Sequence, residues 1–174
     1  MKNWFKYITI MFAGAGLLTT SCEDSNTVVD QVVEGTERGA VLRTVNLISN
    51  EIPIGNDASN FAVEVEIQDE ENGDLVGSVE VYLGFRDNTV EEGETDLDTQ
   101  EVLVATIEPS SFETGPFGLP RFGYQITLPE MLAALPITNA DVNGSDQFTI
   151  RFELVLTDGR RYSFADNTGT LTGS

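Results

Sequence analysis

The amino-acid sequence predicts an all-β domain, in which about seven short antiparallel strands pack as two sheets and one short helix interrupts them. Two observations favour this class. From Ala40 onward, apolar residues recur at every second position, which is the period of a strand with one buried and one solvated face. Turn-forming Gly, Asp, Asn and Pro residues separate these runs. The chain has 174 residues, which is enough for one domain and a tail.

Seven runs of the sequence show the strand pattern. The clearest three are Phe61–Gln68, Val79–Arg86 and Phe148–Thr157, and we expect their apolar positions to form the core. The remaining four are Ala40–Ser49, Glu101–Glu108, Phe122–Thr127 and Arg160–Phe164.

Two of the connections between these runs carry clear turn signals. Glu70–Asp74 separates the second and third runs. Asp158 and Gly159 separate the last two runs. This pair predicts a two-residue hairpin of type I′, because both central residues of that turn need a positive φ.

The helix is predicted after the fifth strand. Thr127 and Glu130 have the spacing of a capping box, and Pro129 stands in the first turn, where its missing N–H is harmless. Apolar residues follow at helical spacing, and Pro136 ends the helix. We expect this helix to close one end of the sandwich.

The composition excludes several classes of function. The chain has 29 Asp and Glu residues against 9 Lys and Arg, a net charge of -20, and no His. The absence of His rules out a Ser-His-Asp triad, a Cys-His dyad and an imidazole metal site. The strong negative charge repels phosphate backbones, so we expect no nucleic-acid partner.

The N-terminal segment has the pattern of a secretory signal peptide. Lys2 and Lys6 precede the apolar run Tyr7–Leu18, which is too short to cross a bilayer. The segment Leu17–Cys22 resembles the lipobox of bacterial lipoproteins, although Thr19 stands where that family prefers Leu. The resemblance implies cleavage between Ser21 and Cys22 and acylation of Cys22, so residues 1–21 are the expected leader.

Residues 22–39 are expected to be the lipidated Cys and a flexible acidic tether. As a random coil, Glu23–Gly39 would reach about 20–25 Å from the membrane. Glu23 and Asp24 resemble the acidic export tag of some outer-membrane lipoproteins, which implies an outer-membrane protein facing the cell surface; the alternative is an ordinary solvated linker. An acidic chain avoids anionic headgroups, so the membrane contact is expected through acyl chains.

The remaining residues, 40–174, are predicted to form an immunoglobulin-like sandwich. Three sets of residues resemble the small lipoproteins of starch-utilisation-type polysaccharide-uptake systems: Arg38–Thr44, then Phe112 with Gly118–Arg121, then Asp158–Arg160 with Ser163–Phe164. In that group an immunoglobulin-like domain stands on the lipid tether and further domains bind glycan. We expect either that the glycan-binding part is missing here or that the chain is truncated at its C-terminus.

An acidic segment, Asp87–Glu101, is a candidate calcium site. Hard oxygen ligands at alternating positions suit Ca²⁺. The candidate ligands are Asp87, Glu91, Glu94, Asp96 and Asp98. The segment departs from the EF-hand pattern, since Glu92 replaces the turn glycine. The alternative is a solvated acidic loop without metal, and we expect no other cofactor.

Aromatic residues around a Gly- and Pro-containing loop are candidate contacts for a ligand or partner. They are Phe112, Phe117, Phe122 and Tyr124. Three interpretations are open: the rings cover the core, contact a protein partner, or stack on sugar faces.

Three functions from different classes follow. The favoured one is a non-catalytic, membrane-anchored surface lipoprotein that acts as a binding or spacer module linked to glycan capture. The second is a structural accessory subunit that docks on an outer-membrane transporter through the Phe loop. The third is a glycoside hydrolase with paired carboxylates, which no residue spacing marks. We therefore expect no enzymatic activity.

Overall fold

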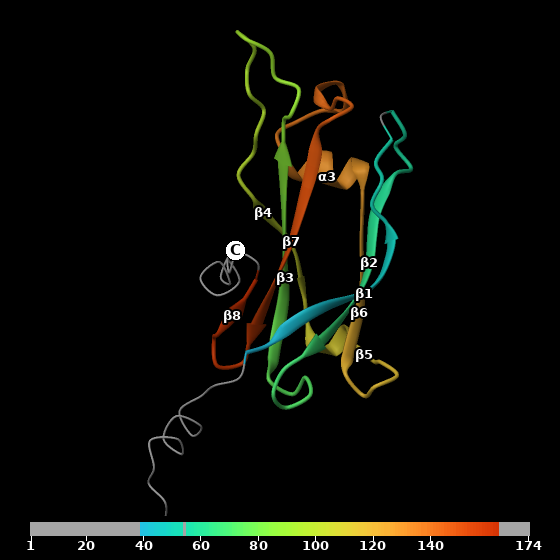
Figure 1. The fold of residues 1–174 in the computed structure, drawn as a ribbon, viewed down its shortest axis with the longest axis vertical. Helices are drawn as coiled ribbons and strands as arrows, with labels where there is room; N and C mark the ends of the chain where they lie inside the picture. The colour runs from blue at the N-terminus through green and yellow to red at the C-terminus, as the bar shows by residue number, and fades with distance from the viewer. Residues whose placement is uncertain (1–38, 54, 164–174) are drawn as a thin grey trace, which may run out of the picture. The chain divides into compact units, whose positions relative to one another are not determined.

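The computed structural model describes residues 39–53 and 55–163, and within these ranges the chain is a two-layer β-sandwich (Figure 1). One antiparallel sheet has the strand order β1-β2-β6-β5 and the other β4-β3-β7-β8. The strands are β1 (Val41–Ser49), β2 (Asn60–Gln68), β3 (Val76–Arg86), β4 (Val102–Ile107), β5 (Glu113–Thr114), β6 (Pro120–Thr127), β7 (Gln147–Leu156) and β8 (Arg161–Tyr162). The predicted all-β sandwich is confirmed; its immunoglobulin-like topology stays a prediction.

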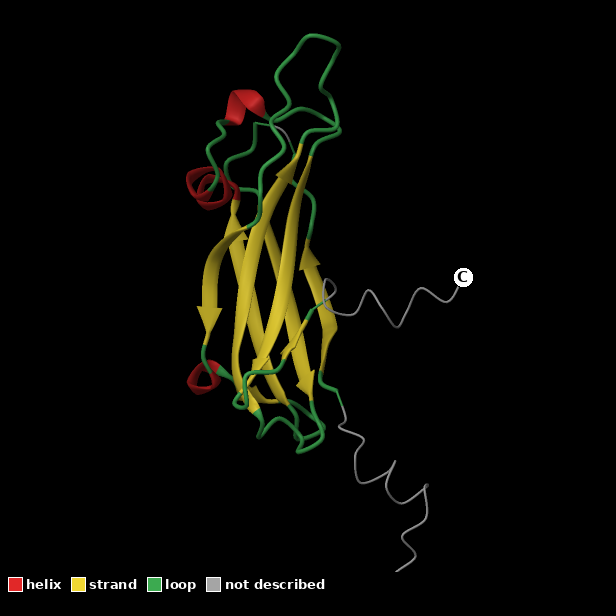
Figure 2. Cartoon of the chain, turned by 90° about the vertical axis from the view of Figure 1, so that its left-hand side faces the viewer, coloured by secondary structure: helices red, strands yellow, loops and turns green. Residues whose placement is uncertain are grey.

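Helical segments and loops lie at the two ends of the sheets, as Figure 2 shows. They are the helix α3 (Leu128–Ala134) and the 3₁₀ turns η1 (Pro109–Ser111) and η2 (Asn139–Asp141). Each predicted strand corresponds to an observed one, with β3 starting at Val76 rather than Val79. Strand β5 was not predicted, because two residues are too short to show a period.

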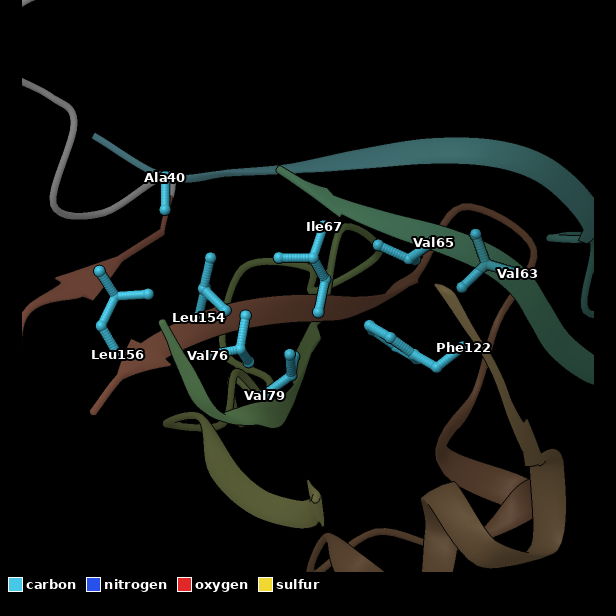
Figure 3. Packing of buried hydrophobic residues seen from close by; sticks show 9 residues of the cluster. All are labelled: Ala40, Val63, Val65, Ile67, Val76, Val79, Phe122, Leu154 and Leu156. Atoms are coloured by element: carbon cyan, nitrogen blue, oxygen red, sulfur yellow. The ribbon is translucent and has the colours of Figure 1, made fainter. Parts of the chain in front are cut away.

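The main core lies between the two sheets, where the alternating residues of β2 face those of β3 and β7 (Figure 3). Ile67 on β2, Val79 on β3 and Leu154 on β7 have no exposed surface. Burying each of these side chains contributes about 1.5–3 kcal/mol relative to leaving it in water. The predicted core strands are therefore confirmed.

Helix α3 closes one end of the sandwich, as expected. Met131 on α3 is fully buried and belongs to a second apolar cluster with Leu83 and Phe85 of β3. The Glu130 carboxylate accepts hydrogen bonds from the Thr127 N–H at 2.8 Å and from the Thr127 hydroxyl at 2.7 Å. These bonds start the helix at the predicted position.

The turn between β7 and β8 differs from the prediction. The Gly159 N–H donates to the Leu156 carbonyl at 3.0 Å, and the Leu156 N–H donates to the Arg160 carbonyl at 2.9 Å. Gly159 has a φ of 89°, whereas Asp158 has no positive φ. The predicted two-residue type I′ turn is wrong: the loop has three residues and places one residue, the glycine, in the left-handed region.

Strand β1 lies at the edge of its sheet and is poorly covered. Of the strands that the structure describes, it pairs only with β2, and the pairing register shifts twice, between Thr44 and Asn46 and between Leu47 and Ser49. Its exposed apolar side chains include Leu47 (50 %) and Ile48 (64 %). The alternation in this segment therefore predicts the strand correctly but not its burial.

Candidate functional site

Several sequence predictions lie outside the described residues. They are the leader 1–21, the cleavage and lipidation site at Ser21 and Cys22, the rest of the tether up to residue 38, and the C-terminal residues 164–174. In the described ranges, no helix is both long enough and apolar enough to span a bilayer. The lipid anchor stays a prediction.

The acidic candidate residues lie in the loop between β3 and β4, where their carboxylates hold the loop's own backbone. Four of the five carboxylates accept hydrogen bonds from backbone N–H groups of the same loop. Asp87 accepts from Thr89 at 3.0 Å and from Leu97 at 3.3 Å. Glu94 accepts from Glu91 at 3.1 Å, Asp96 from Asp98 at 2.9 Å, and Asp98 from Asp87 at 2.7 Å. Within the part of the chain that the structure describes, no three acidic side chains converge as a metal site would require. Calcium binding by this loop stays a prediction.

Three of the four aromatic candidates pack in or against the core. Phe122 is 4 % exposed and stacks on Phe112 with 5.6 Å between ring centroids. Tyr124 meets Phe152 edge to face, also at 5.6 Å, and burial raises the pKa of its hydroxyl. The structure supports the core-covering interpretation for these rings, which are not presented to a ligand.

Phe117 is the exception among the aromatic candidates. It lies in the hairpin between β5 and β6 and is 77 % exposed. The Gly115 N–H donates to the Leu119 carbonyl at 2.8 Å, and Gly118 has a φ of 79°, so the turn is closed and its phenyl ring projects into solvent. Phe117 is therefore available for a contact with another molecule.

A groove that the sequence did not predict lies between β1 and β7, and we call it the edge groove. Its volume is about 650 Å³. Leu42 and Thr44 of β1 line one side, and Ile150 and Phe152 of β7 line the other. Glu101, at the end of the acidic loop, adds a charged rim.

A second hollow, of about 370 Å³, continues the edge groove along β7. It shares Ile150 with the edge groove and also contacts Phe148. Ile52 and Pro53, in the connection between β1 and β2, form its other wall. The two hollows together follow one edge of β7 from Phe152 to Gln147.

The outer face of the sheet that contains β7 carries a cross-strand network of arginines and carboxylates. Arg151 donates to Glu101 at 2.8 Å and also to Glu153, and its guanidinium carbon lies 4.2 Å from the centroid of the Tyr82 ring. Arg161 donates to the same Glu153 carboxylate. This network explains why long polar side chains occupy the polar positions of these strands, and it fixes the position of Glu101 at the groove rim.

The other sheet holds a buried carboxylate on its outer face. Glu66 of β2 is 1 % exposed, and it accepts hydrogen bonds from Arg121 of β6 at 2.8 Å and from Arg43 of β1. The Arg121 and Arg43 hydrogen bonds lower the pKa of Glu66. The sequence pattern predicted a solvated position here, because period-two alternation does not reveal pairing across strands.

The carboxylates whose pKa is displaced in the described residues all have it lowered, by arginine, hydroxyl or backbone N–H donors. They are Glu66, Glu80, Glu130, Asp141 and Asp158. A general acid for glycoside cleavage needs a raised pKa, so none of these five has that property.

Comparison with family models, with curated proteins and with solved structures finds no match to this chain.

Proposed function

We propose that this chain is a lipid-anchored, non-catalytic surface module whose β-sandwich binds a ligand, or holds a binder away from the membrane, in glycan capture. The observation that carries the proposal is Cys22, which directly follows a complete signal pattern ending in Leu17–Ser21. Acylation of Cys22 with more than one chain would give stable attachment, because each buried CH₂ contributes about 0.8 kcal/mol.

The position of the sandwich supports this arrangement. The first described strand begins at Val41, so the sequence has residues 23–39 between Cys22 and the sandwich, and we propose that they act as a spacer. The resemblance to lipoproteins of polysaccharide-uptake systems supports a link to glycan capture.

We also propose that the sandwich is immunoglobulin-like. Labelled A, B, C, C′, D, E, F and G in chain order, the strands give sheets A-B-E-D and C′-C-F-G. The first is the sheet order of an immunoglobulin constant domain, and the second contains its C-F-G sheet with one added strand. This agreement of strand order supports the assignment, which a solved structure of the chain would test.

The anchor is tested by replacing Cys22. The full chain and its Cys22→Ala variant would be expressed in a Gram-negative host with radiolabelled palmitate and partitioned into Triton X-114. We expect label and detergent partition for the wild-type chain and neither for the variant. Ser21→Ala is the matched control, because a small residue before the Cys preserves cleavage. A wild-type chain without label would refute the anchor.

Glycan binding is tested separately with a polysaccharide panel. We expect retention of the full chain on at least one polysaccharide, and weaker retention for Phe117→Ala, because the exposed ring is lost. Leu103→Ala is a matched control, since Leu103 is 53 % exposed on β4, which belongs to the sheet that does not contain β5 and β6. No retention on any polysaccharide would remove the glycan part and leave the anchor untouched.

The second candidate function is a structural accessory subunit of an outer-membrane transporter complex. Phe117 favours it, because one exposed aromatic ring on a closed hairpin suits a protein contact. We expect a transporter to co-purify with the wild-type chain in mild detergent and to be lost with Phe117→Ala but not with Leu103→Ala. A monomer without partners would argue against this function.

A further inference from the structure

Within residues 39–53 and 55–163, strand β7 lacks a strand neighbour on one side along most of its length. On one side it pairs with β3 from Gln147 to Leu156. On the other side, within the described residues, it pairs with β8 only at Leu154 and Val155. Among the residues that the structure describes, the backbone from Gln147 to Glu153 therefore has a strand neighbour on the β3 side alone.

The backbone groups of every second residue of β7 point toward the β8 side of the strand. The Leu156 N–H donates to the Arg160 carbonyl across this side of β7. Backbone N–H and C=O groups alternate in direction along a strand, so those of Phe152, Ile150 and Phe148 face the same side. The described residues pair with none of these three on that side. Such a row of unpaired groups is a template for an added strand.

The floor beside this edge is apolar and incompletely covered. Phe148, Ile150 and Phe152 are only half-buried, whereas Val81 and Leu83 on the neighbouring strand β3 have no exposed surface. The half-buried residues line the edge groove and its continuation. A further layer of side chains over β7 would complete the core at this side of the sandwich.

We propose that the edge groove binds an extended, basic segment of another protein, which adds a strand to the free edge of β7. Its backbone would pair with Phe148, Ile150 and Phe152, and every second side chain would enter the apolar floor. Six residues in a strand span about 20 Å, which matches the edge from Gln147 to Phe152. This inference goes beyond the proposed function, because it does not depend on Cys22 or on glycan.

Charge selects the class of the partner. The chain has a net charge of -20, and the rim of the groove includes Asp98 and Glu101 from the acidic loop. The rim also includes Arg86 and Arg151, and Arg151 and Glu101 form an ion pair, so the rim charges balance and the excess negative charge is that of the whole chain. The field of the whole chain therefore attracts a cationic segment and repels a second copy of the same chain. Lys or Arg at alternate positions of the partner would remain in solvent beside the acidic loop.

The test measures binding of blocked octapeptides to the full chain in mild detergent. We expect an alternating lysine–valine peptide to bind, an alternating glutamate–valine peptide to bind at least tenfold more weakly, and affinity for the lysine peptide to fall with salt. A lysine–valine peptide with alternate amides methylated should also lose at least tenfold, because it lacks the donors of a strand. Equal binding of the methylated peptide, or no binding of the unmodified one, would overturn the proposal.

Two matched variants of β1 locate the binding. Thr44→Trp places a large ring in the groove, whereas Val45→Trp places it at the next position of β1, which does not line the groove. We expect at least a tenfold loss of affinity for the first and less than a twofold change for the second. Slowed amide exchange at Phe148, Ile150 and Phe152 on peptide binding would identify the paired edge. Equal effects of the two variants would place the peptide elsewhere and overturn the proposal.

Other occupants of the groove have distinct signatures. A chain ending at Ser163 should bind the lysine peptide as tightly as the full chain. A tenfold gain after this truncation would assign the groove to the chain's own last residues, and dimers that the peptide dissociates would assign it to a second copy. Either result would overturn the proposal.

Discussion

The central strand β3 and the edge strand β1 are both rich in apolar residues but differ greatly in burial. Val81 and Leu83 on β3 have no exposed surface, whereas Leu47 and Ile48 on β1 are at least half exposed. Strand β3 has β4 and β7 as neighbours, while β1 has β2 alone among the described strands. Periodicity therefore identifies a strand, and the number of neighbouring strands decides how deeply its side chains are buried.

A large effect is expected from the same substitution made in both strands. Leu83→Ala should lower the free energy of unfolding by about 2–5 kcal/mol, because it leaves a cavity among packed side chains. Leu47→Ala should lower it by less than about 1 kcal/mol, because half of that side chain is already in water. Urea unfolding followed by circular dichroism measures both values, with an unchanged m-value as the sign of an intact fold. Similar losses in the two variants would contradict the difference in burial.

A smaller effect is expected at Glu66, a buried carboxylate that accepts hydrogen bonds from the central strand β6 and from the edge strand β1. Glu66 is held by Arg121 of β6, which is 17 % exposed, and by Arg43 of β1, which is 55 % exposed. Arg121→Ala and Arg43→Ala should each raise the pKa of Glu66. The shift should be larger for Arg121→Ala, because the Arg121 hydrogen bond is the largest cause of the lowered pKa and is better shielded from solvent.

The pH dependence of stability follows from the sign of this shift. The folded-state pKa of Glu66 lies below its unfolded value of about 4.3. The ionised carboxylate therefore stabilises the fold above that pH, and the contribution is lost as the pH falls through the folded-state pKa. The difference between wild type and Arg121→Ala should be greatest near neutral pH and should shrink once Glu66 is protonated in both proteins. Unfolding free energies measured from pH 7 to pH 3 test this, and a difference that grows toward acid would contradict it.

Most of the fold could be predicted from the sequence because its elements depend on local patterns. The strand runs, the helix with its Thr127–Glu130 cap and the turn at Glu70–Asp74 all follow from spacing along the chain. The buried Asp69, which accepts N–H groups of that turn, occupies a position where local pattern gives no sign of burial. The burial of Glu66 depends likewise on which strands become neighbours.

The candidate site was less predictable for the same reason. Phe117 is exposed, whereas Phe112 and Phe122 of the same predicted set pack against or in the core, and composition does not distinguish the two directions. In the described part of the chain, β8 pairs with only two residues of β7. The sequence of β7 itself carries no sign of how far its neighbour extends, so the edge groove could not be predicted.

The smallest expected effect comes from a charge placed on β1. Ile48 lies where the pairing of β1 with β2 shifts register, and it is 64 % exposed. Ile48→Lys should change the free energy of unfolding by less than about 0.5 kcal/mol, because a lysine on an edge strand leaves its charge in water. Val81→Lys is the contrasting variant and should prevent folding, since it buries an unpaired charge. A loss above about 1 kcal/mol for Ile48→Lys would mean that another part of the chain covers β1, and the two strands would then differ less than their exposure indicates.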